Sequence, residues 1–108
     1  MESLDLAEVK GCLDSLAMEL LKGRFPNVDV EPYYRLAEAY VEERMRRDKG
    51  YRRDVESGSP LKTLISLTMD KVASAYDFIS GKKDEERVDR LLNDFVTMLA
   101  TTLKAWGF

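Results

Sequence analysis

The sequence predicts an all-α fold, a four-helix bundle whose helices pack antiparallel or orthogonally. Apolar residues recur at three- and four-residue spacings in four stretches, and glycine or proline separates those stretches. Alternating polar and apolar residues, the pattern of a strand, extend over no useful length. With 108 residues the chain has room for one hydrophobic core. We therefore expect residues 1–108 to form a single helical domain.

The first helix is expected over residues 5–22, where leucines and Val9 recur around an apolar stripe. Its N-terminal cap is expected to be Ser3 or Asp5. A cation followed by a glycine, here Lys22 and Gly23, is typical of a helix end.

The second helix is expected to begin at Pro32, with Glu31 as its cap, because proline is tolerated at the first helical position. Its apolar positions follow a single helical stripe: Tyr33, Leu36, Ala37, Tyr40, Val41 and Met45. The stretch 50–58 has a glycine at each end and no sustained period, which predicts a loop.

The third helix is expected to start at Ser59 and Pro60, a serine cap followed by a proline, and to run to Ser80. The fourth helix follows Asp84, which is expected to cap it, and continues at helical spacing to the C-terminus. The third helix is so apolar that we expect it to be central or to lie under a partner.

Composition limits the function classes. The chain is 44% apolar and 34% charged, and no stretch approaches the roughly 20 apolar residues that span a bilayer. We therefore expect a cytoplasmic protein without membrane contact. It contains no histidine, the commonest metal ligand and general base. Its one cysteine, Cys12, cannot form an internal disulfide and is expected to be a buried structural thiol.

Motifs of small enzymes and metal sites are absent from the sequence, including CxxC, HExxH and the P-loop. The acidic groups Glu42–Glu43 and Asp84–Glu86 could bind a cation or serve as an acid–base pair. A solvated helix face and a helix start explain them more simply, because adjacent helical residues do not face each other. We expect no enzymatic activity, metal, cofactor or small-molecule substrate.

A basic segment extends from Arg44 to Arg53, with six cations and one anion in a chain whose net charge is −3. Such a segment could neutralise nucleic-acid phosphates, dock on an acidic protein, or be only an exposed helix end with a loop. The residues expected to make such contacts are Arg46, Arg47, Lys49, Arg52 and Arg53.

A second set of candidates consists of large apolar and aromatic residues that a lone bundle has difficulty covering. Exposed aromatics commonly mark protein interfaces, although some of these residues could equally cap the core. The partner would be another protein or a second copy. The predicted partner-binding residues are Tyr34, Leu67, Met69, Phe78, Trp106 and Phe108.

The order of these helices resembles the helical domain of the archaeal GINS subunits, components of the replicative helicase assembly. Four segments carry the resemblance: Leu13 to Leu21, Val30 to Glu43, Thr68 to Ala75 and Asp84 to Phe95. Lys71 and Val72 are similar to the end of the family's RxxKI segment. The resemblance implies a subunit that packs against other subunits and bridges replication proteins, with no active site.

The sequence thus predicts a non-enzymatic interaction subunit of a nucleic-acid-processing assembly, such as one for DNA replication. The alternative is a small helical nucleic-acid-binding protein that uses the basic segment. In that case the chain would be similar to the small all-helical subunits of CRISPR effector complexes.

Overall fold

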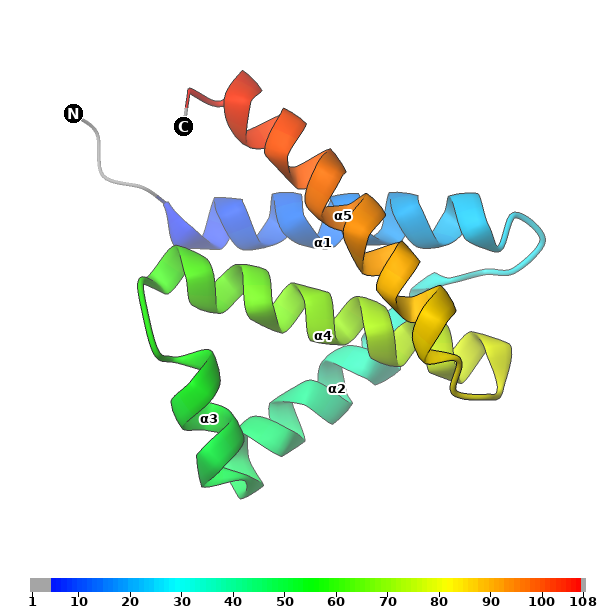
Figure 1. Ribbon diagram of the computed structural model, residues 1–108, viewed down its shortest axis with the longest axis horizontal. Helices are drawn as coiled ribbons and strands as arrows, with labels where there is room; N and C mark the ends of the chain where they lie inside the picture. Colours follow the sequence, from blue (N-terminus) through cyan, green and yellow to red (C-terminus); the bar gives the residue numbers. More distant parts are fainter. Residues whose placement is uncertain (1–4, 108) are drawn as a thin grey trace.

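A computed structural model describes residues 5–107, which form five α-helices (Figure 1). No helix in this part of the chain is both long enough and apolar enough to cross a bilayer. The helices are α1 (Leu6–Arg24), α2 (Glu31–Arg47), α3 (Lys49–Val55), α4 (Pro60–Ser80) and α5 (Glu85–Ala105).

Helix α4 is the centre of the fold and contacts each of the other four helices. α1 and α4 lie side by side and run in the same direction, and α5 crosses both of them obliquely (Figure 1). α2 packs on α4, and α3 follows it at a sharp corner. The predicted all-α class is confirmed. The described residues contain five helices, however, where the sequence predicted four.

Helix starts follow the predicted caps in three cases. The Asp5 carboxylate accepts hydrogen bonds from backbone amides of the first turn of α1, and Ser59 and Asp84 do the same for α4 and α5. The prediction for α2 was wrong, because the cap position is Val30 and Glu31 already lies in the first turn. The negative charge of Glu31 is still favourable there, because it lies near the positive end of the helix dipole.

The predicted loop at 50–58 was wrong over most of its length, because residues 49–55 form α3, while 56–58 are not helical. Asp48 ends α2 and caps α3, its carboxylate accepting from the Tyr51 amide at 2.9 Å. The Arg52 guanidinium donates to the carbonyls of Met45 at 2.7 Å and Arg46 at 3.0 Å. These carbonyls lie at the end of α2, where the helix itself supplies no donors. Capping hydrogen bonds at the corner therefore stabilise α3, although this helix has few apolar residues.

The core lies where α1, α2, α4 and α5 meet around α4. Phe95 is its largest purely apolar side chain and is fully buried. Other fully buried or nearly buried members include Leu13, Leu21, Val30, Ala37, Val72, Ala75 and Leu91. α2 thus contributes one side of its cylinder to the core.

Candidate interaction surface

α2 carries a second apolar stripe, about 100° around the helix from the one that enters the core. Tyr33, Leu36 and Tyr40 are 37%, 55% and 52% exposed. They occupy positions i, i+3 and i+7 and therefore share one side of the helix. Phe78 of α4 is 36% exposed and lies against Tyr40, with ring centroids 6.1 Å apart and the rings perpendicular. We name these four residues the aromatic face.

The stripe that enters the core is offset from the aromatic face by one position. Val30, Tyr34, Ala37 and Val41 are 2% exposed or less. Each residue turns about 100° around a helix, so two stripes one residue apart point to different sides. In the sequence the two stripes appear as a single helical pattern. α2 is therefore apolar on two sides, of which the fold uses only one.

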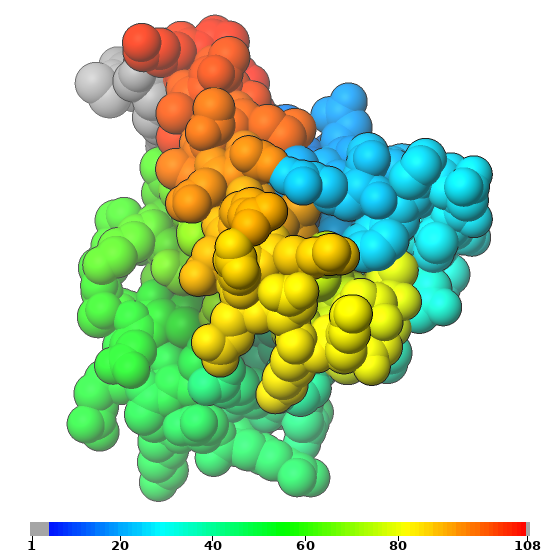
Figure 2. Space-filling model, turned by 45° about the vertical axis from the view of Figure 1, so that its right-hand side comes forward, coloured from blue at the N-terminus to red at the C-terminus, as the bar shows by residue number. Residues whose placement is uncertain are grey.

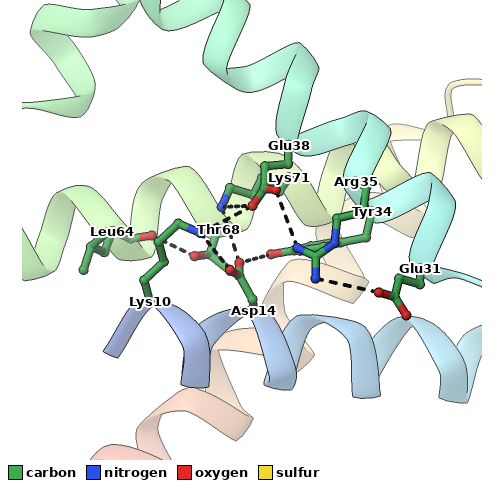
Figure 3. A network of polar contacts seen from close by, with 9 residues as sticks. All are labelled: Lys10, Asp14, Glu31, Tyr34, Arg35, Glu38, Leu64, Thr68 and Lys71. Atoms are coloured by element: carbon green, nitrogen blue, oxygen red, sulfur yellow. Dashed lines mark hydrogen bonds and ion pairs between the residues drawn. The ribbon is translucent and has the colours of Figure 1, made fainter. Parts of the chain in front are cut away.

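A buried polar network fixes which side of α2 faces inward (Figure 3). The Tyr34 hydroxyl donates to Asp14 Oδ1 of α1 at 2.5 Å. Lys71 Nζ of α4 lies 3.3 Å from Asp14 Oδ1 and 3.4 Å from Glu38 Oε2. Side chains from three helices thus meet at one point, and a rotation of α2 would break the contacts that Tyr34 and Glu38 make with the other two helices.

The network balances its charges. Lys10 Nζ lies 3.0 Å from Asp14 Oδ2 and 3.4 Å from Glu38 Oε2, so two ammonium groups face two carboxylates. Arg35 extends the network toward solvent, with its guanidinium 3.5 Å from Glu38 Oε1. Buried charges are tolerated only when paired in this way.

The pKa shifts in the network follow from these contacts. Burial opposes ionisation of Asp14, but the Tyr34 hydrogen bond and the charges of Lys10 and Lys71 outweigh it and lower its pKa. Burial also opposes ionisation of Glu38, and Lys71 and Lys10 again lower its pKa. Burial, reinforced by the bond to Asp14, raises the pKa of Tyr34. Both carboxylates are thus held charged and the phenol neutral.

Tyr34 is consequently not available to a partner, and its predicted role in partner binding was wrong. It is fully buried because its ring belongs to the core and its hydroxyl belongs to the network. The neighbouring Tyr33 occupies the exposed position instead.

The other predicted partner-binding residues differ in exposure. Leu67 is half-buried, and Met69 is half-buried and packs against the core. Trp106 is 39% exposed and lines a groove between α1 and the end of α5 together with Cys12. Cys12 is exposed, so its predicted burial was wrong. Phe108 lies outside the described residues.

Most cations of the basic segment have intramolecular partners. Arg46 and Arg47 both pair with Glu43, one helical turn earlier. The Arg44 guanidinium carbon lies 4.0 Å from the centroid of the Tyr51 ring, a cation–π contact, and Arg52 caps α2. The segment is therefore partly structural, since its cations hold the corner between α2 and α3.

Lys49 and Arg53 are exposed and make no ion pair within residues 5–107. The corner that carries them forms the lower end of the molecule in the view of Figure 2, with side chains reaching outward. The five predicted nucleic-acid or acidic-partner residues thus lie at one corner, but only these two are free of internal ion pairs and hydrogen bonds.

The acidic groups do not converge on a metal site. Among the described residues no cluster of three or more Asp, Glu, Cys or His side chains has the geometry to hold a metal ion. Glu43 forms ion pairs with Arg46 and Arg47, and Asp84 caps α5.

Comparison of the chain with protein-family models, curated proteins and solved structures produced no match. The exposed residues of α2 were missed by the sequence interpretation, which assigned Tyr33, Leu36 and Tyr40 to the core stripe. The sequence carried no clear signal for them, because the apolar residues at 33, 36, 37, 40 and 41 have the spacing i, i+3, i+4, i+7 and i+8 that one core-facing stripe of a surface helix normally shows. The packing of the neighbouring helices decides which edge of that stripe is buried.

Proposed function

We propose that this protein is a non-enzymatic interaction subunit, and that the aromatic face of α2 and α4 binds another protein chain. The observation that carries the proposal is the exposure of Tyr33, Leu36 and Tyr40 along one side of a helix whose other side already fills the core. Phe78 widens this surface onto α4.

The chemistry of the aromatic face suits a protein partner. Tyrosine combines a large apolar ring with a polar tip and is enriched where protein interfaces gain most of their energy. Arg44 and Arg47 lie four and seven residues beyond Tyr40 and so continue the same side of α2. An apolar centre with charged residues at its edge is the usual layout of an interface.

The resemblance to the archaeal GINS helical domain favours an assembly that processes nucleic acid. In such an assembly the aromatic face would contact a neighbouring subunit. The corner between α2 and α3 would then lie beside that contact, since Arg47 belongs to the end of α2 and Lys49 begins α3.

Site-specific photo-crosslinking in the producing cells tests the proposal. A benzoylphenylalanine at the position of Leu36 is expected to form adducts with protein. The matched control is the same group at Val96 of α5, which is 46% exposed and lies on a helix that does not pack on α2. Adducts at Leu36 and not at Val96 support the proposal. Equal yields at the two positions, or none at Leu36, would overturn it.

Direct binding of single-stranded nucleic acid is the second candidate function. The exposed cations Lys49 and Arg53, which have no ion-pair partner in the described part of the chain, favour it. Phosphate contacts release counterions, so the affinity would fall steeply between 50 and 200 mM salt. Fluorescence anisotropy with a labelled oligonucleotide measures this, and the Lys49→Ala, Arg53→Ala variant should lose the signal. Absence of binding at 50 mM salt would exclude this function, and binding that the substitutions leave unchanged would exclude Lys49 and Arg53 as its contacts.

A further inference from the structure

We infer that the partner of the aromatic face is a second copy of this chain, bound so that the two α2 helices lie antiparallel across a twofold axis. This inference rests on the proposed function and specifies its partner. It follows from the distribution of charge along α2 and from the symmetry that two identical surfaces must obey.

The residues that flank the aromatic face along the chain carry opposite charge. Asp29 is exposed and lies two residues before the start of α2, four residues before Tyr33. At the other end lie Arg44 and Arg47, whose side chains are 48% and 81% exposed, although Arg44 also pairs with Asp48 and Arg47 with Glu43 of the same chain. The apolar residues of the aromatic face lie between these ends. One surface therefore presents an anion, an apolar centre and cations in sequence.

Such a surface is complementary to itself in one direction only. In an antiparallel pair centred between Leu36 and Tyr40, Leu36 of one copy lies opposite Tyr40 of the other. The same register brings Arg47 opposite Asp29 at both ends of the pair. In a parallel pair Arg47 would meet its own counterpart, and like charges opposed across an interface disfavour association. Twofold interfaces are also the commonest kind in homo-oligomers.

The size of the surface indicates a weak dimer. α2 has 17 residues and is therefore about 26 Å long. A stable complex buries about 800 Å² on each partner. A strip of that length and about 10 Å wide, the diameter of a helix, has a projected area of only about 260 Å², well below that value. We therefore expect a dissociation constant on the order of micromolar.

Sedimentation velocity of the purified chain over a concentration series tests the association. The weight-average mass should rise from the chain mass of 12.4 kDa toward twice that value. Leu36→Glu should remain monomeric across the series, because it places two carboxylates at the centre of the pair. Val96→Glu adds the same charge at an exposed apolar position of α5 and should associate like the wild type. Circular dichroism melting shows whether each variant is folded.

A charge exchange tests the antiparallel register. Arg47→Glu and Asp29→Arg should each weaken the dimer about tenfold, since each substitution acts at both ends of the pair. Combined in one chain they restore opposite charges at both ends, and affinity should return to within about threefold of the wild type. Arg46→Glu is the matched control. Arg46 pairs with the same Glu43 but points off the aromatic face, so the dimer should be retained.

The outcomes separate this inference from the proposed function. A wild type that stays monomeric overturns the inference, while protein adducts at Leu36 in cells would still support the function with a different partner. A dimer that Leu36→Glu leaves intact also overturns the inference, since the contact then lies elsewhere. If the single exchanges abolish the dimer and the combined exchange does not restore it, the antiparallel pairing is overturned. Absence of both dimer and adducts overturns inference and function together.

Discussion

At the scale of single residues, Tyr33 and Tyr34 show what the sequence could not decide. They are adjacent and identical in type, yet Tyr34 is fully buried and Tyr33 is 37% exposed. The difference arises from Asp14 on another helix, which accepts the Tyr34 hydrogen bond. Periodicity along one helix does not report a polar partner 20 residues away in the chain. The buried role of Tyr34 was therefore outside the reach of the sequence pattern.

Removal of the Tyr34 hydroxyl should destabilise the fold. Tyr34→Phe leaves the ring in place but deprives the buried Asp14 carboxylate of its 2.5 Å donor. A hydrogen bond to a charged group is worth about 1.5–3 kcal/mol, so we expect the unfolding free energy to fall by about 2 kcal/mol. Urea denaturation measures it. Tyr33→Phe is the control and should change the value little, and equal effects of the two substitutions would contradict the assigned network.

The network also predicts a loss of stability in acid. The pKa values of Asp14 and Glu38 lie below their ordinary 3.8 and 4.5 in the folded chain, because Tyr34, Lys10 and Lys71 outweigh the effect of burial. The unfolded chain then binds more protons at low pH. The stabilisation is complete above the ordinary values and is lost as the pH falls through the lowered ones.

Urea denaturation at pH 7, 4 and 3 follows this change. The wild-type unfolding free energy should decrease across the series, and an Asp14→Asn, Glu38→Gln chain should start less stable but show a shallower decrease. Parallel decreases in the two proteins would show that other carboxylates cause the acid sensitivity.

At the scale of helices, the capped starts and the glycine end of α4 could be predicted from the sequence, and α3 could not. α4 was predicted over its full length because Ser59, Pro60 and Gly81 are strong local signals. α3 lacks an apolar stripe and begins near Gly50, so its pattern resembled a loop. It forms because Asp48 caps it and Arg52 joins it to the end of α2. Each of these contacts is a weak signal in the sequence, and together they stabilise α3 only when α2 and α3 are both present.

Loss of the Asp48 cap should therefore affect the corner and leave the core intact. Asp48→Ala removes the acceptor for the Tyr51 amide, and a lost N-cap typically costs about 1 kcal/mol. Native-state hydrogen exchange should show faster exchange of the α3 amides, with those at the centre of α4 protected as before. Uniform acceleration in both helices would contradict the local role of this cap.

The two sides of α2 should respond differently to the same substitution. Val41→Ser places a hydroxyl at a position that is 2% exposed and should lower the unfolding free energy by about 2 kcal/mol or more. Leu36→Ser falls on the exposed side and should change it by less than about 0.5 kcal/mol. Thermal unfolding of dilute protein measures both. Comparable losses would mean that the aromatic face belongs to the core.

At the scale of the whole molecule, the all-α class followed from periodicity, but the arrangement of the helices did not. Short connections favour antiparallel neighbours, yet α1 and α4 run in the same direction with α5 across them (Figure 1). In that arrangement Lys10, Asp14, Glu38 and Lys71 meet from three helices, a contact that no single stretch of sequence encodes. It also determines the side of α2 that remains uncovered, and thus the candidate site.

The central claim is that this uncovered side is covered by a second molecule. Isotope-filtered NMR on a mixture of labelled and unlabelled chains tests it most directly, because it detects only contacts between copies. We predict intermolecular Overhauser effects between the Leu36 methyl groups of one copy and the Tyr40 ring of the other, at concentrations where the dimer is populated. Intermolecular effects confined to other helices, or none at such concentrations, would contradict the account.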